Sequence, residues 1–233
     1  MNNTKNVLDF LKVRFSWGRV GNDKLGGTRF LYIDKLGMGG GPLGSLGLGQ
    51  GVNQGLRGNP NLTWETSDKM NYGIDFQLFS DLKGSFDFFT EKRTQILLQR
   101  QSIPAFQGIE LGNIPKANMG KVDNYGYEIE LNHNKAILSD LSISARGNFS
   151  YAKNTVKFFD EPIRDESYVH RYRTTDYSVA QQWGYKIDKK SNGGYWTSQE
   201  EIDNSPLKYS FGNPRPGDFK HVDMTGDNVI DER

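Results

Sequence analysis

Several long stretches of the chain alternate between apolar and polar residues. The clearest is 141–151, LSISARGNFSY, where apolar side chains recur at every second position for most of its length. Because successive side chains of a β-strand point to opposite faces of a sheet, a period of two predicts strands with one apolar and one polar face. The same pattern, less regular in the last stretch, is seen in 12–17, 69–79, 127–131 and 85–98. No stretch of similar length repeats every 3.6 residues, so the sequence predicts an all-β chain.

Two folds accommodate strands of this kind, and the connections between strands distinguish them. A β-sandwich turns its apolar faces inward against each other, whereas a transmembrane barrel turns them outward to lipid. Short connections at 80–84 and 133–140 alternate with long ones at 21–63, 100–118 and from 158 onward. Outer-membrane barrels alternate short periplasmic turns with long external loops in this way.

The fold predicted from this alternation is a partial transmembrane β-barrel. We expect antiparallel strands, about five of them and long, joined by long extracellular loops. The predicted organisation is a set of barrel strands over 1–157, followed by an extracellular loop region over 158–233 that ends in an Asp-rich turn. Along the strands, the polar positions that would face the lumen include Arg14, Asp75, Glu128, Glu130 and Arg146.

Composition excludes several classes of function. The net charge of +1 provides no basic surplus for nucleic acid, and the absence of Cys removes disulfides and thiolate sites. The three His residues are scattered, and the chain has no nucleophile-elbow or metalloprotease motif. The sequence therefore predicts a protein that is not an enzyme.

Six segments occur in an order that resembles one known family. They are LKVRFSWGRVGND (11–23), NPNLTWETSDKMNYGIDFQLF (59–79), NMGKVDNYGYEIELN (118–132), ISARGNFSYAKNTV (143–156), QQWGYKIDKKSNGGYWTSQEEID (181–203) and GNPRPGDFKHVDMTGDNVID (212–231). Together they resemble the late barrel region of the SusC/RagA family of TonB-dependent outer-membrane transporters of Bacteroidetes.

This resemblance implies a function and a set of partners. Members of the family combine a 22-stranded barrel with an internal plug, and a SusD-like surface lipoprotein serves as the lid. They import oligosaccharides or peptides across the cell outer membrane with energy delivered by TonB. The chain resembles only the barrel part and shows no signal-peptide pattern, so the resemblance implies a fragment whose TonB contact lies in a missing plug region.

The last residues resemble part of a calcium-binding loop. In HVDMTGDNVIDER (221–233), oxygen-bearing residues recur at every second position, as in an EF-hand, and Asn228 stands where that loop has Gly. The predicted ligands are Asp223, Thr225, Asp227, the carbonyl oxygen of Val229, and Asp231. A metal-free polar turn, in which the Asp side chains bind local N–H groups, is the alternative.

A second interpretation belongs to another functional class. A secreted β-sandwich that binds carbohydrate, with a calcium-stabilised loop, would show the same strand alternation. The two hypotheses differ in what covers the apolar face of the strands: hydrocarbon in the transporter, a second sheet in the sandwich.

Overall fold

The computed structural model describes most of the chain, in two compact units that we treat separately. The described residues are 7–23, 29–39, 47, 49, 51–104, 107–164, 172–190 and 192–231. The first unit comprises Met1–Pro162 and Thr174–Val179, and the second comprises Ile163–Arg173 and Ala180–Arg233. Part of the Gly-rich stretch within 21–63 lies outside the described residues.

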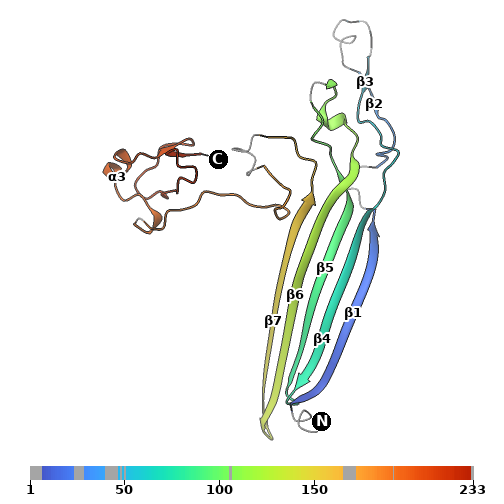
Figure 1. Ribbon diagram of the computed structural model, residues 1–233, viewed down its shortest axis with the longest axis vertical. Helices are drawn as coiled ribbons and strands as arrows, with labels where there is room; N and C mark the ends of the chain where they lie inside the picture. The colour runs from blue at the N-terminus through green and yellow to red at the C-terminus, as the bar shows by residue number, and fades with distance from the viewer. Residues whose placement is uncertain are drawn as a thin grey trace. The chain divides into compact units, whose positions relative to one another are not determined.

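Five long strands form one antiparallel sheet in the first unit. They are β1 (Leu8–Asn22), β4 (Glu65–Leu78), β5 (Leu82–Leu98), β6 (Ala117–Leu138) and β7 (Leu141–Phe158). Their order in the sheet is β1-β4-β5-β6-β7, so each of these strands pairs with the next one along the chain (Figure 1). The prediction of about five long antiparallel strands is confirmed. Among the described residues, β1 and β7 each pair on one side only, which leaves the sheet open like a section of barrel wall.

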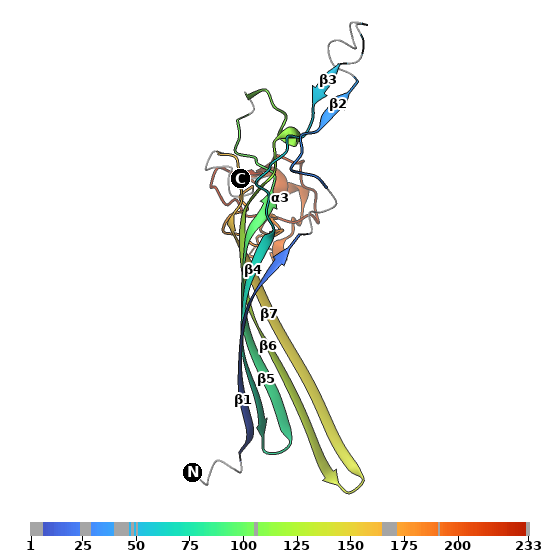
Figure 2. The same cartoon turned by 90° about the vertical axis from the view of Figure 1, so that its right-hand side faces the viewer.

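Short and long connections lie at opposite ends of this sheet. Residues 79–81 join β4 to β5, and residues 139–140 join β6 to β7 at the same end (Figures 1 and 2). The long connections lie at the other end. They contain the small β2–β3 hairpin (Leu36–Met38 and Val52–Gln54) and the short helix η2 (Leu111–Asn113). The predicted alternation of connection lengths therefore holds.

Both short connections are shorter than the sequence predicted. A connection was expected at 80–84, but β5 begins at Leu82. Another was expected at 133–140, but β6 continues to Leu138, and Lys135 pairs with Ile143. His133, expected in a turn, lies within the strand opposite Ala145. Residues 132–135 are all polar, so apolar and polar side chains do not alternate there and the sequence does not indicate a strand. The backbone of this segment nevertheless pairs with β7.

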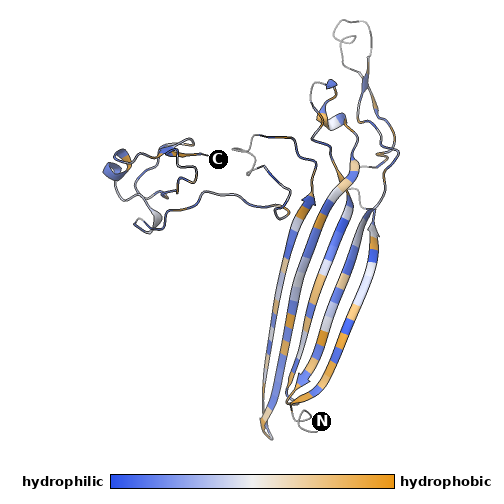
Figure 3. Ribbon diagram, in the orientation of Figure 1, coloured by the Kyte–Doolittle hydropathy of each residue, from blue (hydrophilic) through white to orange (hydrophobic). Residues whose placement is uncertain are grey.

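The register collects the apolar side chains into rows on one face of the sheet, which we call the apolar face. One row runs Phe15–Tyr72–Phe88–Tyr127–Tyr151, one residue from each strand. The rings of Phe15 and Tyr72 are 5.0 Å apart and those of Tyr127 and Tyr151 5.4 Å apart. Polar residues alternate with these rows along every strand (Figure 3). Cross-strand aromatic contacts of this kind stabilise a sheet and hold its register.

The apolar face is exposed to an unusual degree. Val13, Phe15 and Trp17 of β1 are 72%, 62% and 61% exposed, and Phe149 of β7 is 55% exposed. No second sheet of the described residues covers these side chains, so the sandwich interpretation does not hold for this fold. Contiguous apolar surface of this extent indicates a face that meets an apolar medium or a partner.

Two glycines allow aromatic rings to lie flat across the sheet. A Cβ atom added to Gly84 would lie 2.4 Å from the ring of Phe76 on the apolar face. On the opposite face, a Cβ added to Gly126 would lie 2.5 Å from the ring of Phe89 and 2.3 Å from the carbonyl oxygen of Tyr151. Each ring thereby covers a backbone position that lacks a side chain of its own.

The second unit is loop-rich and has a small core of its own. Its elements are η3 (Asn192–Gly194), α3 (Gln199–Asp203), and the parallel strands β8 (Lys208–Tyr209) and β9 (Val229–Ile230). Isolated bridges join Ile187 to His221 and Tyr195 to Phe219. Trp196, only 1% exposed, and Ile230 fill the centre.

Among the described residues, no helix is both long and apolar enough to cross a bilayer.

We expect Gly126→Ala to destabilise the sheet. The new methyl group would have to displace both the Phe89 ring and the Tyr151 backbone, so the free energy of unfolding should fall by roughly 1–3 kcal/mol, the usual range for overpacking. Urea unfolding of the full-length protein in detergent measures it. Gly147→Ala is the matched control, because a Cβ there has no neighbour within 4 Å. Equal loss in both variants would contradict the close approach of Phe89 to Gly126.

Candidate functional site

Arg14 organises a charge network on the face opposite the apolar one, which we call the polar face. Its Nε and Nη2 donate to the two carboxylate oxygens of Asp75, both at 2.9 Å, and Nη2 also donates to Asp87 Oδ2 at 2.9 Å. Gly73 lies directly between Arg14 and Asp87 in the register. A Cβ at Gly73 would lie 2.7 Å from Arg14 Cζ, so the missing side chain lets the guanidinium reach across β4. A planar fork of this kind matches carboxylate geometry, and Lys does not replace it.

A second ion pair lies on the same face and joins β6 to β7. Arg146 Nη2 donates to Glu130 Oε1 at 2.7 Å, and the side-chain amide of Asn132 donates to the same oxygen at 3.0 Å. Glu128 lies on this face between Asp87 and Ser150 in the register and forms no ion pair with another described residue. All five residues predicted to face the lumen share this face, and the structure joins four of them as two ion pairs.

Glu91 anchors a third cluster toward the long-loop end of the polar face. It is 9% exposed and accepts hydrogen bonds from Ser67 Oγ at 2.7 Å and from Arg93 Nε at 2.9 Å, while Lys69 Nζ lies 3.6 Å away. Glu91 and Asp87 were not among the lumen-facing residues predicted from the sequence. Both lie in the stretch 85–98. Phe89 in this stretch is an apolar residue on the polar face, so apolar and polar residues do not alternate regularly there. Such an array of opposite charges can bind water and polar solutes.

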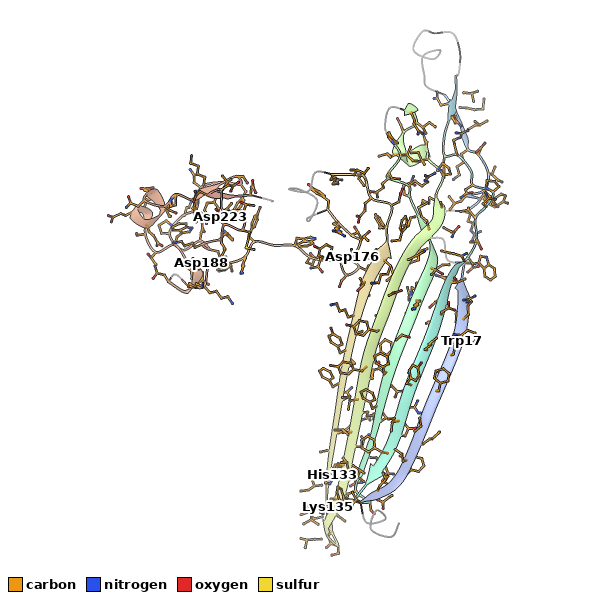
Figure 4. The ribbon with its side chains drawn as sticks, viewed as in Figure 1. Trp17, His133, Lys135, Asp176, Asp188 and Asp223 are labelled. Atoms are coloured by element: carbon orange, nitrogen blue, oxygen red, sulfur yellow. The ribbon has the colours of Figure 1, made fainter. Side chains whose placement is uncertain are left out.

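The apolar face ends in a charged row toward the long loops and in single polar side chains toward the short turns. Toward the long loops, Arg19, Asp68, Lys92 and Asp123 form a row of alternating charge across four strands, and Arg19 Nε donates to Asp68 at 2.6 Å. Toward the short turns, His133 lies opposite Leu82 and Ala145. Lys135 lies opposite Ile143 and pairs with Asp81 at 3.8 Å (Figure 4).

The apolar band is measured on β6 from Asp123 to His133, and its height follows from strand geometry. Asp123 and His133 are ten residues apart on β6, which corresponds to about 34 Å along a strand that rises ~3.4 Å per residue. In a barrel whose strands tilt by about 35–45°, that length spans a height of about 26 Å. The band contains four largely apolar rows, through Tyr125, Tyr127, Ile129 and Leu131, and the outermost of them ends in Lys153 on β7.

In the second unit, Glu201 ties α3 to the core. Its Oε2 accepts from the backbone N–H of Thr197 at 3.0 Å and from Thr197 Oγ1 at 2.8 Å, and its Oε1 accepts from Lys220 Nζ at 3.1 Å. Lys220 also stacks over the Trp196 ring, 4.5 Å from its centroid. The Thr197 backbone N–H, its hydroxyl and the Lys220 ammonium group together lower the pKa of Glu201 to about 2.

The Asp-rich turn is held by the carboxylate of Asp223. Asp223 Oδ1 accepts from the backbone N–H of Gly226 at 2.7 Å and of Thr225 at 3.0 Å, and Oδ2 accepts from the N–H of Asn228 at 2.7 Å. The Gly226 N–H, followed by these other donors, lowers the pKa of Asp223 despite partial desolvation. Asn228 has φ 62°, so it adopts the left-handed conformation expected for the residue that replaces Gly.

The structure places the predicted calcium ligands as follows. Asp223, Thr225 and Asp227 meet through hydrogen bonds, with Thr225 Oγ1 donating to Asp227 Oδ1 at 2.9 Å. Val229 begins β9, and Asp231 follows it. Within the described ranges, no group of three or more His, Asp or Glu side chains is arranged to hold a metal ion. The hydrogen bonds suffice for a polar turn, and calcium binding there stays a prediction.

We expect acid to loosen the contact between α3 and Trp196. Because the pKa of Glu201 is depressed in the folded state, its contribution is complete above its ordinary pKa of 4.5 and is lost as the pH falls toward 2. Pepsin cleavage of the full-length protein within 196–204 should therefore accelerate over this range. Glu201→Gln should be cleaved fast already at pH 4.5. Glu200→Gln, on the same helix, should keep the wild-type profile, and a wild-type profile in Glu201→Gln would refute the role of this carboxylate.

Comparison with known proteins agrees with this geometry. A family model described as TonB dependent receptor-like, beta-barrel matches residues 6–227. The chain is 29% identical over 231 residues to TonB-dependent receptor P26 of Formosa agariphila, an alignment that covers 94% of this chain and 22% of that protein. It is 27% identical over 155 residues to TonB-dependent receptor SusC of Bacteroides thetaiotaomicron, with coverage of 65% and 15%.

A solved structure shares the fold. The RagAB peptide importer in its closed-closed state superposes with a TM-score of 0.59 at 19% identity, over 96% of this chain and 23% of that chain. The chain thus spans less than a quarter of the length of each of these proteins. Since the family model covers nearly all of its residues, the chain belongs to the TonB-dependent receptor-like β-barrel family.

Proposed function

We propose that the five strands form part of the wall of an outer-membrane receptor that imports nutrients. The observation that carries the proposal is the apolar band, which on β6 is about 26 Å high from the charged row of Asp123 to His133. Outer-membrane barrels present an outward apolar band about 25 Å tall. The exposed Val13, Phe15 and Trp17 then lie in hydrocarbon, where their exposure costs nothing.

The polar face supports the same placement. In a barrel the side chains opposite the lipid face line the interior, and the networks around Arg14, Glu130 and Glu91 would meet water there. The unpaired outer edges of β1 and β7 would be costly in lipid, where backbone groups have no water to bind. We therefore propose that further strands of the complete receptor pair with both edges.

The printed names of two relatives support a proposal for the cargo and the energy source. The solved relative is named a peptide importer, and SusC is named a TonB-dependent receptor. We propose that the complete receptor takes up oligosaccharides or peptides with energy from TonB, together with a SusD-like surface lipoprotein. These strands would serve as a non-catalytic wall, and the second unit as part of an extracellular loop.

Adjacent residues of β7 test the orientation of the sheet. Phe149→Arg would place a charge near the middle of the apolar band and should destabilise the full-length receptor by about 2–4 kcal/mol, with loss of protein from the outer-membrane fraction. Asn148→Arg, on the polar face next to it, should insert normally. The readouts are membrane fractionation and the shift in gel mobility between heated and unheated samples. Equal tolerance of both variants would mean that lipid does not contact this face.

A growth experiment tests the import function. A strain that lacks the receptor should fail to grow on a defined oligosaccharide or on a defined peptide mixture as sole carbon source, and the restored gene should rescue that growth. Tagged receptor purified from the rescued strain should retain a surface lipoprotein. Normal growth of the deletion strain on every oligosaccharide and peptide source would remove the proposed cargo classes.

A further inference from the structure

A basic surface lies where β6 and β7 approach the long-loop end of the apolar face. It consists of Lys121, Lys153 and Lys157, and we call it the basic corner. Lys153 lies opposite Tyr125, one row inside the charged row that contains Asp123. Lys121 lies opposite Phe158, and Lys157 occupies the bulge between this pair and the next. All three lysines are exposed, and with Asp123 the corner carries a net charge of +2.

Within the described part of the chain, these lysines have no ionic partner. None of the three forms a salt bridge with a described residue, whereas Arg19 on the same face is held by Asp68 at 2.6 Å. The short-turn end differs, because Lys135 there pairs with Asp81, and Asp9 accepts from Ser80. The excess positive charge is therefore confined to one end of the band.

Aromatic rings accompany the basic corner. Tyr125, Tyr151 and Phe158 are 42%, 41% and 41% exposed and surround the lysines on β6 and β7. Aromatic and basic side chains together are typical of the level where a bilayer passes from hydrocarbon to headgroups, since lysine stems lie along apolar surface while their ammonium groups reach outward. Lys121 and Lys153 stand about 14 Å apart along the strands, because their rows differ by four residues. That spread suits a layer of headgroups better than one small anion.

We propose that the basic corner binds the phosphate groups of anionic lipid headgroups in the leaflet next to the long loops. The inference rests on the proposed membrane placement, because only that placement brings headgroups to this level. Two observations select this occupant: the positive charge complements phosphate, and the corner continues directly from the band that would contact the acyl chains. The short-turn end, where Lys135 pairs with Asp81, has no comparable cluster of lysines among the described residues.

Lipid retention by the full-length receptor tests the proposal. The triple variant Lys121→Gln, Lys153→Gln, Lys157→Gln is compared with wild type in nanodiscs of phosphatidylcholine with increasing phosphatidylglycerol, and native mass spectrometry counts the retained lipids. A lysine near an anionic surface is worth about a fivefold change in affinity, so the preference for phosphatidylglycerol should fall by about a hundredfold in the triple variant. High salt should reduce the wild-type preference toward that of the variant.

Two further variants make the result specific. The triple variant Lys12→Gln, Lys83→Gln, Lys208→Gln removes equal charge from positions off the apolar face, and it should retain lipid like wild type. Arginine at the three corner positions should also preserve the preference. Gel mobility before and after heating verifies that each variant is folded.

The alternative outcomes separate this proposal from the one on which it rests. If the glutamine variant inserts and keeps the wild-type lipid preference, the basic corner is not a headgroup site, while the wall function stands. If inorganic phosphate displaces phosphatidylglycerol and chloride at the same ionic strength does not, the corner is a small-anion site and the proposal is overturned. If the wild-type receptor itself does not insert into membranes, the proposed wall function is refuted, and the headgroup proposal that rests on it is refuted as well.

Discussion

The antiparallel hydrogen-bonded ladder is the constraint on which the rest of this structure depends. It runs with few interruptions from β1 to β7, and the bulges lie near the strand ends, outside the stretch from Asp123 to His133. Because the side-chain period is two, a shift of one residue in any strand would exchange its two faces. The rows of aromatic rings and the ion pairs exist only in this register.

The two faces of the ladder have opposite chemistry: one is apolar, and the other carries ion pairs. Apolar rows on one face of an open sheet are stable when an apolar medium covers them, and a height of about 26 Å matches the apolar band of outer-membrane barrels. In the proposed wall, the face behind them meets an aqueous interior, where Arg14 can hold Asp75 and Asp87 without deep burial. Gly73 and Gly126 serve this arrangement, because large side chains cross the strands at those positions. The polar face is therefore as specifically built as the lipid-facing one.

Charge divides the two ends of the apolar band. At the short-turn end, Lys135 pairs with Asp81. At the long-loop end the lysines of β6 and β7 find none among the described residues, although Arg19 and Asp68 close by are tightly paired. If the two leaflets of a membrane differ in charge, this difference between the two ends of the band would favour one depth and one orientation of the proposed barrel wall in the membrane. The second unit has its own small core around Trp196.

The sequence by itself determined which segments are strands and which side chains share a face. Alternation is a local property, so Arg14, Asp75, Glu128, Glu130 and Arg146 could be assigned to one face before any pairing was known. The left-handed conformation of Asn228 was predictable for the same reason, since it depends on the residue type and its turn. The sequence order of motifs also indicated the family.

Only the tertiary structure decided what lies opposite what. The partners Asp75 and Asp87 are 61 and 73 residues from Arg14, and no local pattern specifies that Gly73 will stand between them. The extension of β6 to Leu138 is likewise set by the residues of β7 that pair with it, and not by its own polar sequence. Strand propensity and alternation depend on a few neighbouring residues. Register, ion pairs and the limits of the apolar band depend on residues that are distant in sequence and pair across the sheet.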